Sequence, residues 1–171
     1  GSSGGEGAAL ATGMSPLGLG NDIGGSLRNP AHCCGIASIK PSTGVIPDAQ
    51  MFPIEDIGLS AQLMLTQGVM ARRVADVRAG FNVVSGAHPR DPVSIPVNLT
   101  DLRAGEKLRV AVMAEPPGGS THPEIAAVVR RAGDALAAAG HNVTEATPPD
   151  FELACATWSI QLNGELILQW P

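Results

Sequence analysis

A serine at the end of a glycine-rich stretch has the surroundings that covalent chemistry on a carbonyl group requires. The stretch covers residues 20–28 and reads GNDIGGSLR. If the Ser26 hydroxyl attacks a carbonyl carbon, a negatively charged oxygen forms. Backbone N–H groups aimed at that oxygen stabilise it, and three stand in a row before the serine, on Ile23, Gly24 and Gly25. The same residues are also typical of a tight turn without a catalytic role, so both interpretations stay open here.

A second run of serines and glycines opens the chain, where residues 1–6 read GSSGGE. The segment AALA at residues 8–11 favours a helix, which we predict over residues 4–13. The apolar residues that follow predict a short buried strand over residues 17–19, leading into the glycine-rich stretch. A helix followed by a strand returns the chain to its starting point, so we expect Ser2 and Ser26 to meet at one site.

Together these segments resemble the amidase signature family. The similarity rests on GSSGGE at residues 1–6, PLGLGNDIGGSLR at 16–28, CGI at 34–36 and KP at 40–41, and it resumes in QGVMAR at 67–72 and VAD at 74–76. The resemblance implies an α/β fold in which a mixed central sheet is covered by helices, with this chain forming a part of it. It also implies an activity, the hydrolysis of a carboxylic acid amide to an acid and ammonia or an amine through an acyl-serine intermediate.

The resemblance assigns catalytic roles to both serines. Ser26 matches the nucleophile of the family, and Ser2 matches a bridging serine that relays protons and whose preceding peptide bond is cis in the family. The family's base is a lysine, which accepts a proton only if burial keeps it neutral. That lysine lies upstream of the first serine motif. Lys40 matches a structural Lys-Pro position and Lys107 falls in a later predicted strand, so neither is assigned as the base.

Other residues of the two motifs also match functional positions of the family. The resemblance implies an oxyanion hole formed by the amides of Ile23, Gly24, Gly25 and Ser26. Positions that bind substrate or brace the loop are matched by Ser3, Asn21, Asp22 and Arg28, and the arginine is also suited to an acidic substrate. Asn21 stands where the family usually has threonine and Val45 where it usually has arginine, so we expect substrate contacts and packing to differ there.

Two alternatives to a stand-alone amidase remain open. One is the glutamine-hydrolysing amidotransferase subunit of the same family, which uses the same loop. The other is a catalytically inactive chain that lacks the lysine base. Family chains extend further at both ends, so we interpret these 171 residues as an internal part of an amidase, truncated at both ends. We expect activity from the complete enzyme rather than from this chain alone.

Composition narrows the class of partners. Lys and Arg number 11 against 16 Asp and Glu, a net charge of −5, which argues against a dedicated nucleic-acid or anionic-membrane surface. No apolar run is long enough to span a bilayer, and no signal peptide is recognisable. The three cysteines, two of them adjacent, do not suggest a disulfide framework and favour the reducing cytoplasm. We therefore expect a cytoplasmic enzyme acting on a small-molecule amide, with a homodimer as the candidate assembly of the full-length protein.

No metal or cofactor is expected. His32, Cys33 and Cys34 lack a second pair of ligands at a useful spacing. Gly118 and Gly119 precede a predicted helix, but the rest of a phosphate-binding fingerprint is missing.

We divide the partial amidase domain into a catalytic serine core (1–47), a loop and helix segment (48–98) and a strand-helix-strand-helix segment (99–171). Further predictions for the first two are a strand over 36–39, a mostly irregular stretch over 48–67 in which 60–65 is ambiguous, a helix over 72–84 and an extended loop over 88–96. The apolar face of that helix is formed by Val74, Val77, Phe81 and Val84.

The last segment has the clearest helix of the chain, over residues 122–139, with Thr121 as its N-cap and Glu124 as its capping-box partner. Its predicted apolar face contains Ile125, Val128, Val129, Ala132 and Leu136. Strands are predicted over 108–113 and 142–146 on either side, and this order favours parallel pairing. A final helix is predicted over 151–168.

Overall fold

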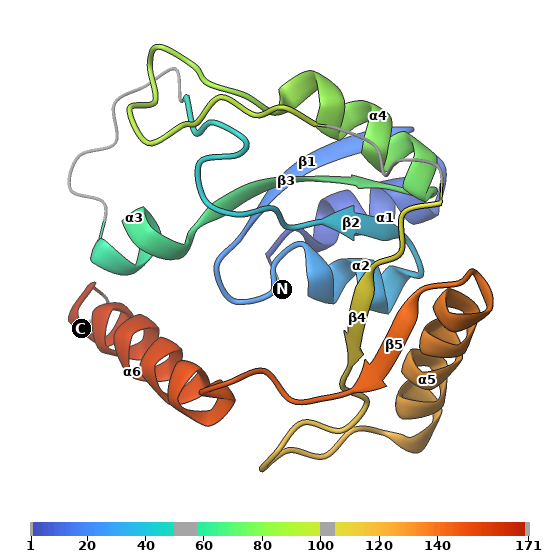
Figure 1. Cartoon of the computed structure of the whole chain (residues 1–171). Coiled ribbons are helices and arrows are strands. Elements are labelled where there is room, and N and C mark those ends of the chain that lie inside the picture. Colours follow the sequence, from blue (N-terminus) through green and yellow to red (C-terminus); the bar gives the residue numbers. More distant parts are fainter. Residues whose placement is uncertain (1, 50–57, 100–104, 170–171) are drawn as a thin grey trace. The chain divides into compact units, whose positions relative to one another are not determined.

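The computed structural model of the chain describes residues 2–49, 58–99 and 105–169, which belong to two compact units, Gly1–Thr100 and Asp101–Pro171 (Figure 1). The first unit contains α1 (Gly4–Ala11), β1 (Leu17–Asp22), α2 (Arg28–Cys34), β2 (Ala37–Ile39), α3 (Leu59–Met64), β3 (Thr66–Ala71) and α4 (Val74–Val84). The second unit contains β4 (Arg109–Val112), α5 (Pro123–Ala138), β5 (Asn142–Glu145) and α6 (Phe151–Gln169). Each unit combines helices and strands, which confirms the predicted α/β class.

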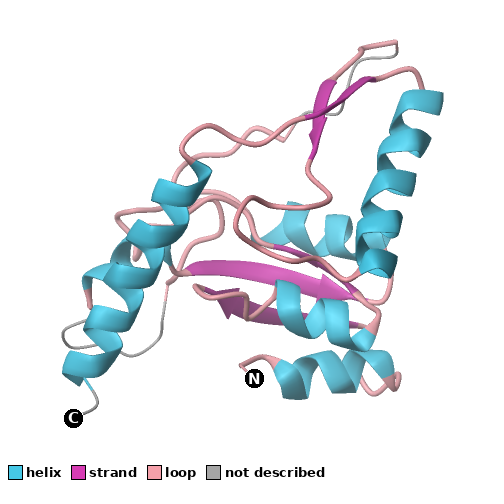
Figure 2. Cartoon of the chain, turned by 90° about the horizontal axis from the view of Figure 1, so that it is seen from below, coloured by secondary structure: helices cyan, strands magenta, loops and turns pink. Residues whose placement is uncertain are grey.

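The first unit is built on a three-stranded sheet in the order β1-β3-β2, with β3 antiparallel to both neighbours. Strand β3 pairs along the whole of β1, from Leu17 opposite Ala71 to Asp22 opposite Thr66. Helices α1 and α2 cover one face of this sheet and α4 the other (Figure 1). Figure 2 shows the strands of the two units as separate sheets.

Both faces of β3 are buried, because this strand lies in the middle of the sheet. Successive side chains of a strand point to opposite faces, so the neighbours Val69 and Met70 belong to different clusters. The buried residues of the cluster on the α4 face are Ile46, Val69, Ala71 and Val77, and those of the cluster on the α1–α2 face are Leu10, Leu27 and Met70.

The prediction of a mostly irregular stretch over residues 48–67 is wrong at Leu59 and at residues 66–67, and most of the stretch it left ambiguous is helical. There α3 occupies the ambiguous stretch and Thr66 and Gln67 begin β3, while residues 50–57 lie outside the described part of the chain. The segment TQGVMA lacks the alternation of polar and apolar residues that marks a half-buried strand. A strand covered on both faces has no reason to alternate, which is why β3 escaped the prediction.

Strand β1 confirms the strand predicted over residues 17–19 and extends it to Asp22. The prediction that this strand is buried is wrong for Leu19, whose side chain is 60% exposed. The glycines of β1 instead face the helices, because a Cβ at Gly18 would overlap the Glu6 side chain of α1.

Helices α1 and α4 and strand β2 confirm the predictions over 4–13, 72–84 and 36–39. The expected apolar face of α4 is right for Val77, which is buried, and wrong for Val74, which is 75% exposed. Gly80 contributes to the buried face instead, packed against the side chains of Leu17 and Val69.

In the second unit, β4 and β5 pair in parallel with α5 between them in sequence, as predicted. The prediction for α5 is wrong in two details. The N-cap is His122 rather than Thr121, and its side chain accepts a hydrogen bond from the Glu124 amide. The buried residues are Ala126 and Gly133, whereas the expected face is largely exposed at Ile125, Val128 and Leu136. Small residues face the two strands because they let the helix approach closely.

Among residues 2–49, 58–99 and 105–169, no helix combines the length and apolar character needed to cross a bilayer. The same residues contain no group of three or more His, Cys, Asp or Glu placed to hold a metal ion. Cys33, Cys34 and Cys155 are free thiols.

Candidate active site

Ser26 lies in the turn between β1, which ends at Asp22, and α2, which begins at Arg28. The serine is partly buried. Its neighbour Gly25 has a φ of 110°, a conformation that glycine adopts at little cost and other residues rarely adopt. The Gly25 carbonyl accepts a hydrogen bond of 2.7 Å from the Asn29 amide, which joins the turn to the first residues of α2.

The turn is organised around the carboxylate of Asp22, whose side chain is fully buried. Its Oδ1 accepts hydrogen bonds from the Gly25 amide at 2.7 Å and from Arg28 Nη2 at 2.9 Å. Its Oδ2 accepts from the Leu27 amide at 3.1 Å, the Arg28 amide at 3.3 Å and Arg28 Nε at 3.0 Å. Both carboxylate oxygens are therefore occupied by donors from the turn and the first residue of α2.

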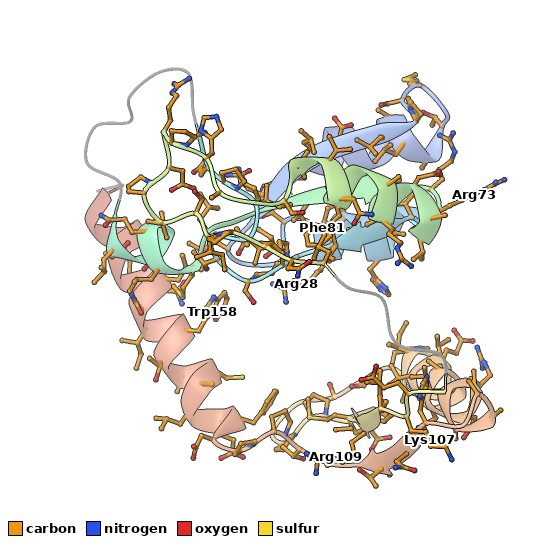
Figure 3. All side chains as sticks on the ribbon, turned by 45° about the horizontal axis from the view of Figure 1, so that its top comes forward. Arg28, Arg73, Phe81, Lys107, Arg109 and Trp158 are labelled. Carbon is orange, nitrogen blue, oxygen red and sulfur yellow. The ribbon has the colours of Figure 1, made fainter. Side chains whose placement is uncertain are left out.

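These contacts determine the charge state of Asp22. Burial by itself would raise the pKa of the Asp22 carboxyl, but the Arg28 guanidinium and the backbone amides of Gly25, Leu27 and Arg28 outweigh it and hold that pKa well below its usual range. The hydrogen bond with Asp22 likewise raises the pKa of Arg28. The turn is thus held by an ionised carboxylate, with Arg28 as a bidentate partner whose side chain is still 59% exposed (labelled in Figure 3).

The Asp22 carboxylate also limits which amides face a reacting group. Because the Gly25 N–H donates to Asp22, this member of the predicted oxyanion hole is engaged within the turn. Across the described part of the chain, the N–H groups of Gly24 and Ser26 donate to no protein acceptor. Gly24 is also exposed and Ser26 is partly exposed.

The two serine-containing segments meet at Gly20 of β1. A Cβ on this glycine would lie 3.0 Å from Ser3 Oγ and 3.1 Å from Leu27 Cδ2. Ser2 and Ser26 are the chain neighbours of these two residues, and Figure 1 shows the start of α1 beside the turn before α2. Ser2 is exposed. The peptide bond before Ser2, which is cis in the family, involves Gly1 and lies outside the described residues.

Four other residues considered in the sequence occupy separate positions. Ser3 is the N-cap of α1 and has a φ of 57°. Asn21 is exposed on β1, opposite Gln67 of β3. Lys40 follows β2, which lies at the other edge of the sheet from β1, and Lys107 belongs to the second unit.

Sequence reasoning overlooked the part played by Leu27 and by the glycines of the sheet. Leu27 is fully buried and lies against Gly20 on one side and Gly68 on the other. The signal was present in the sequence, because Gly18 and Gly20 alternate along one strand and so share one face. Glycines at such positions indicate a face that other groups approach closely.

Comparison with known proteins identifies the family of the chain. Residues 1–164 match the model of the Amidase family. The chain is 41% identical over 168 residues to indoleacetamide hydrolase of Bradyrhizobium japonicum, covering 98% of this chain and 36% of that protein. It is 38% identical over 186 residues to 6-aminohexanoate-cyclic-dimer hydrolase of Paenarthrobacter ureafaciens, covering 98% of this chain and 37% of that protein.

Solved structures give the same result. A glutamyl-tRNA(Gln) amidotransferase subunit of Thermotoga maritima superposes with a TM-score of 0.77 at 25% identity, over 96% of this chain and 36% of that one. The structure of a 6-aminohexanoate cyclic dimer hydrolase superposes with a TM-score of 0.73 at 38% identity, over 86% of this chain and 32% of that one. The chain belongs to the amidase signature family. It spans about a third of the length of the curated relatives it matches.

Proposed function

We propose that the protein to which this chain belongs hydrolyses a carboxylic acid amide to an acid and ammonia or an amine. The observation that carries the proposal is the Ser26 turn, held by the buried, ionised carboxylate of Asp22 in a chain of the amidase family. A turn fixed in this way is preorganised, so its amides need not rearrange when charge develops in the transition state.

In the proposed mechanism, Ser26 Oγ attacks the amide carbonyl carbon and its proton passes through Ser2 to the lysine base. The base is a lysine other than Lys40 and Lys107. The negative oxygen of the tetrahedral intermediate accepts hydrogen bonds from the amides of Gly24 and Ser26. The C–N bond then breaks, the relayed proton goes to the leaving amine, and an ester of Ser26 remains. Water hydrolyses that ester by the same steps in reverse order.

Other residues of the meeting point are proposed to position the substrate. Ser3 follows Ser2, Asn21 follows Gly20 in β1, and both present polar side chains. The Ile23 amide completes the oxyanion hole, and the Gly25 amide joins it if its hydrogen bond to Asp22 loosens in the substrate complex. Arg28 braces the turn, and its exposed guanidinium is suited to an acidic group on the substrate.

For the substrate we propose a small arylacetamide, because a relative named indoleacetamide hydrolase is 41% identical over nearly the whole chain. Glutamyl-tRNA(Gln) amidotransferase subunits are further relatives, one of them at 39% identity over 166 residues. Ammonia release from glutamine that depends on a partner protein would favour that second function over the arylacetamide. We place the reaction in the cytoplasm, since three free thiols are typical of a reducing compartment.

The test uses the complete protein and its Ser26→Ala variant, with Ser42→Ala as the matched control. Ser42 is an exposed serine in another turn of the same unit. Ser26→Ala should lower kcat for indole-3-acetamide by at least about a thousandfold, as expected for loss of a nucleophile. Ser42→Ala should stay within about twofold. A fluorophosphonate, which esterifies activated serines, should label Ser26 and no other serine.

Two results would contradict the proposal. Undiminished hydrolysis by Ser26→Ala would remove this serine from the reaction. A complete wild-type protein that neither hydrolyses amides nor reacts with the fluorophosphonate would support the inactive alternative.

A further inference from the structure

The segment QGVMAR at residues 67–72 contains a side chain that the mechanism does not use. Arg72 follows the last residue of β3, and its Nη1 donates two hydrogen bonds to backbone carbonyls far away in the sequence. One acceptor is the Leu10 carbonyl at 2.9 Å, in the last turn of α1. The other is the Ser15 carbonyl at 3.0 Å, in the connection between α1 and β1. The guanidinium therefore joins the end of α1 to the start of β1.

The opposite end of α1 carries the serines. The helix has eight residues and is about 12 Å long at 1.5 Å per residue. Over so short a length a helix moves as a rigid rod, so a tilt at its C-terminal end displaces Ser2 and Ser3 at the other end. The Arg72 hydrogen bonds resist such a tilt because they hold the C-terminal end to two separate points of the backbone.

The same elements meet again in the buried cluster of Leu10, Leu27 and Met70. Leu10 comes from α1, Leu27 follows Ser26 directly, and Met70 precedes Arg72 by two residues on β3. Through this cluster α1 packs against Leu27, the residue after Ser26. Apolar contacts are not directional, however, and allow a helix to rotate and slide. The two hydrogen bonds of Arg72 add a directional constraint that such apolar contacts lack.

We propose that Arg72 is a positioning residue for catalysis, which holds α1 so that Ser2 stays within reach of Ser26. The inference rests on the proposed function, because it assumes that Ser2 relays the proton of Ser26. Proton relay requires hydrogen-bond distances, and a misplacement of about 1 Å can cost about a hundredfold in rate. An arginine that touches neither serine can thus control their reaction.

The chain offers a matched control in the next residue. Arg73 has the same charge and size and is also exposed. Its side chain extends away from the first unit in Figure 3 and makes no hydrogen bond or ion pair within the described residues. Removal of Arg73 changes the net charge as much as removal of Arg72 does, but it leaves α1 untouched.

The experiment is a double-mutant cycle in the complete enzyme. Arg72→Ala and Arg73→Ala are each made in the wild type and in Ser2→Ala, and rates are measured on an activated aryl ester, whose good leaving group keeps slow variants measurable. Arg72→Ala should lower kcat by about 10- to 100-fold with KM within about twofold. Arg73→Ala should change neither by more than about twofold. In the Ser2→Ala background, Arg72→Ala should cost less than about twofold further, because the residue through which it acts is gone.

Arg72→Lys provides a second variant, since an ammonium group keeps the charge and also carries donors but does not reproduce the geometry of the guanidinium. The kcat of Arg72→Lys should fall between those of the wild type and Arg72→Ala. If Arg72→Ala does not fold, Arg72→Lys replaces it in the double-mutant cycle. An equal loss in both Ser2 backgrounds, or a loss equal to that of Arg73→Ala, would overturn the inference. If Ser26→Ala keeps full activity, the proposed function fails instead, and the two failures are distinguishable.

Discussion

Replacement of Asp22 by Asn tests whether the ionised carboxylate organises the turn that carries Ser26. Asn has nearly the same shape but keeps only one acceptor oxygen and presents an NH2 group at the other position. If its oxygen replaces Oδ2, the NH2 group faces the Gly25 amide and Arg28 Nη2, which are themselves donors. If the side chain flips, three donors on Leu27 and Arg28 are opposed instead. The variant will adopt the first orientation, because it loses fewer hydrogen bonds.

The size of the effect follows from those two lost bonds. A backbone N–H left without a partner costs about 1–3 kcal/mol when it is buried, and the Gly25 amide is partly buried. Arg28 is 59% exposed and regains water, so the loss of its ion pair adds at most about 1 kcal/mol. We therefore expect Asp22→Asn to lower the free energy of unfolding by about 1–4 kcal/mol. Arg28→Met should cost only about 1 kcal/mol, because the three backbone donors to Asp22 remain.

The acid dependence of stability provides a second measurement. The folded-state pKa of Asp22 is below its value in the unfolded chain, which is about 3.9. The stabilisation by Asp22 is therefore complete above pH 5 or so and is lost as the pH falls toward the folded-state pKa. Urea unfolding between about pH 3 and pH 7 should show a smaller loss of stability on acidification in Asp22→Asn than in the wild type.

Two outcomes would refute this reasoning. A loss below about 1 kcal/mol in Asp22→Asn would mean that the Gly25 amide finds another acceptor at no cost. A loss in Arg28→Met as large as in Asp22→Asn would mean that the ion pair, and not the backbone donors, holds the turn. The kcat of both variants on the proposed amide substrate should follow the same order as their stabilities.

Three further substitutions probe the surroundings of the turn. Gly25→Ala forces a side chain into a φ of 110° and should lower the free energy of unfolding by about 1–3 kcal/mol. It should also slow the labelling of Ser26 by a fluorophosphonate, and unchanged labelling would argue against a preorganised turn. Leu27→Ala leaves a cavity in a fully buried position and should cost about 2–5 kcal/mol in urea unfolding, whereas less than about 1 kcal/mol would contradict the packing described. Gly68→Ala should cost about 1–3 kcal/mol because its Cβ would overlap the Leu27 side chain and the Ile39 carbonyl. Gly164→Ala, with open space around it in α6, should be neutral or stabilise by up to about 1 kcal/mol, and equal losses in both glycine variants would show that crowding is not the cause.

Local signals in the sequence account for the elements that are buried on one face and exposed on the other. The helix α1 and the strand β1 follow from AALA and from the apolar residues after it, and the parallel pair β4–β5 follows from the order strand, helix, strand. The role proposed for the Ser26 turn rests on its resemblance to the amidase family. The local sequence alone leaves that role open, because a glycine-rich loop before a serine has several interpretations.

What the sequence could not supply depends on contacts between distant residues. Strand β3 lacks any periodic pattern because it is covered on both faces. The hydrogen bonds from Arg72 to Leu10 and Ser15 connect residues that only the fold brings together. The engagement of the Gly25 amide depends on a side-chain geometry that the motif alone does not specify.

The position of β3 also has a consequence for the order in which the first unit folds. During synthesis, β1, the Ser26 turn and β2 leave the ribosome before β3, which is the strand that separates β1 from β2 in the sheet. Met70, which completes the cluster around Leu27, arrives with it. Until then the turn that carries Ser26 lacks the strand against which Leu27 packs. In pulse-labelling hydrogen exchange during refolding, the Leu27 amide should gain protection together with Val69 and not before it.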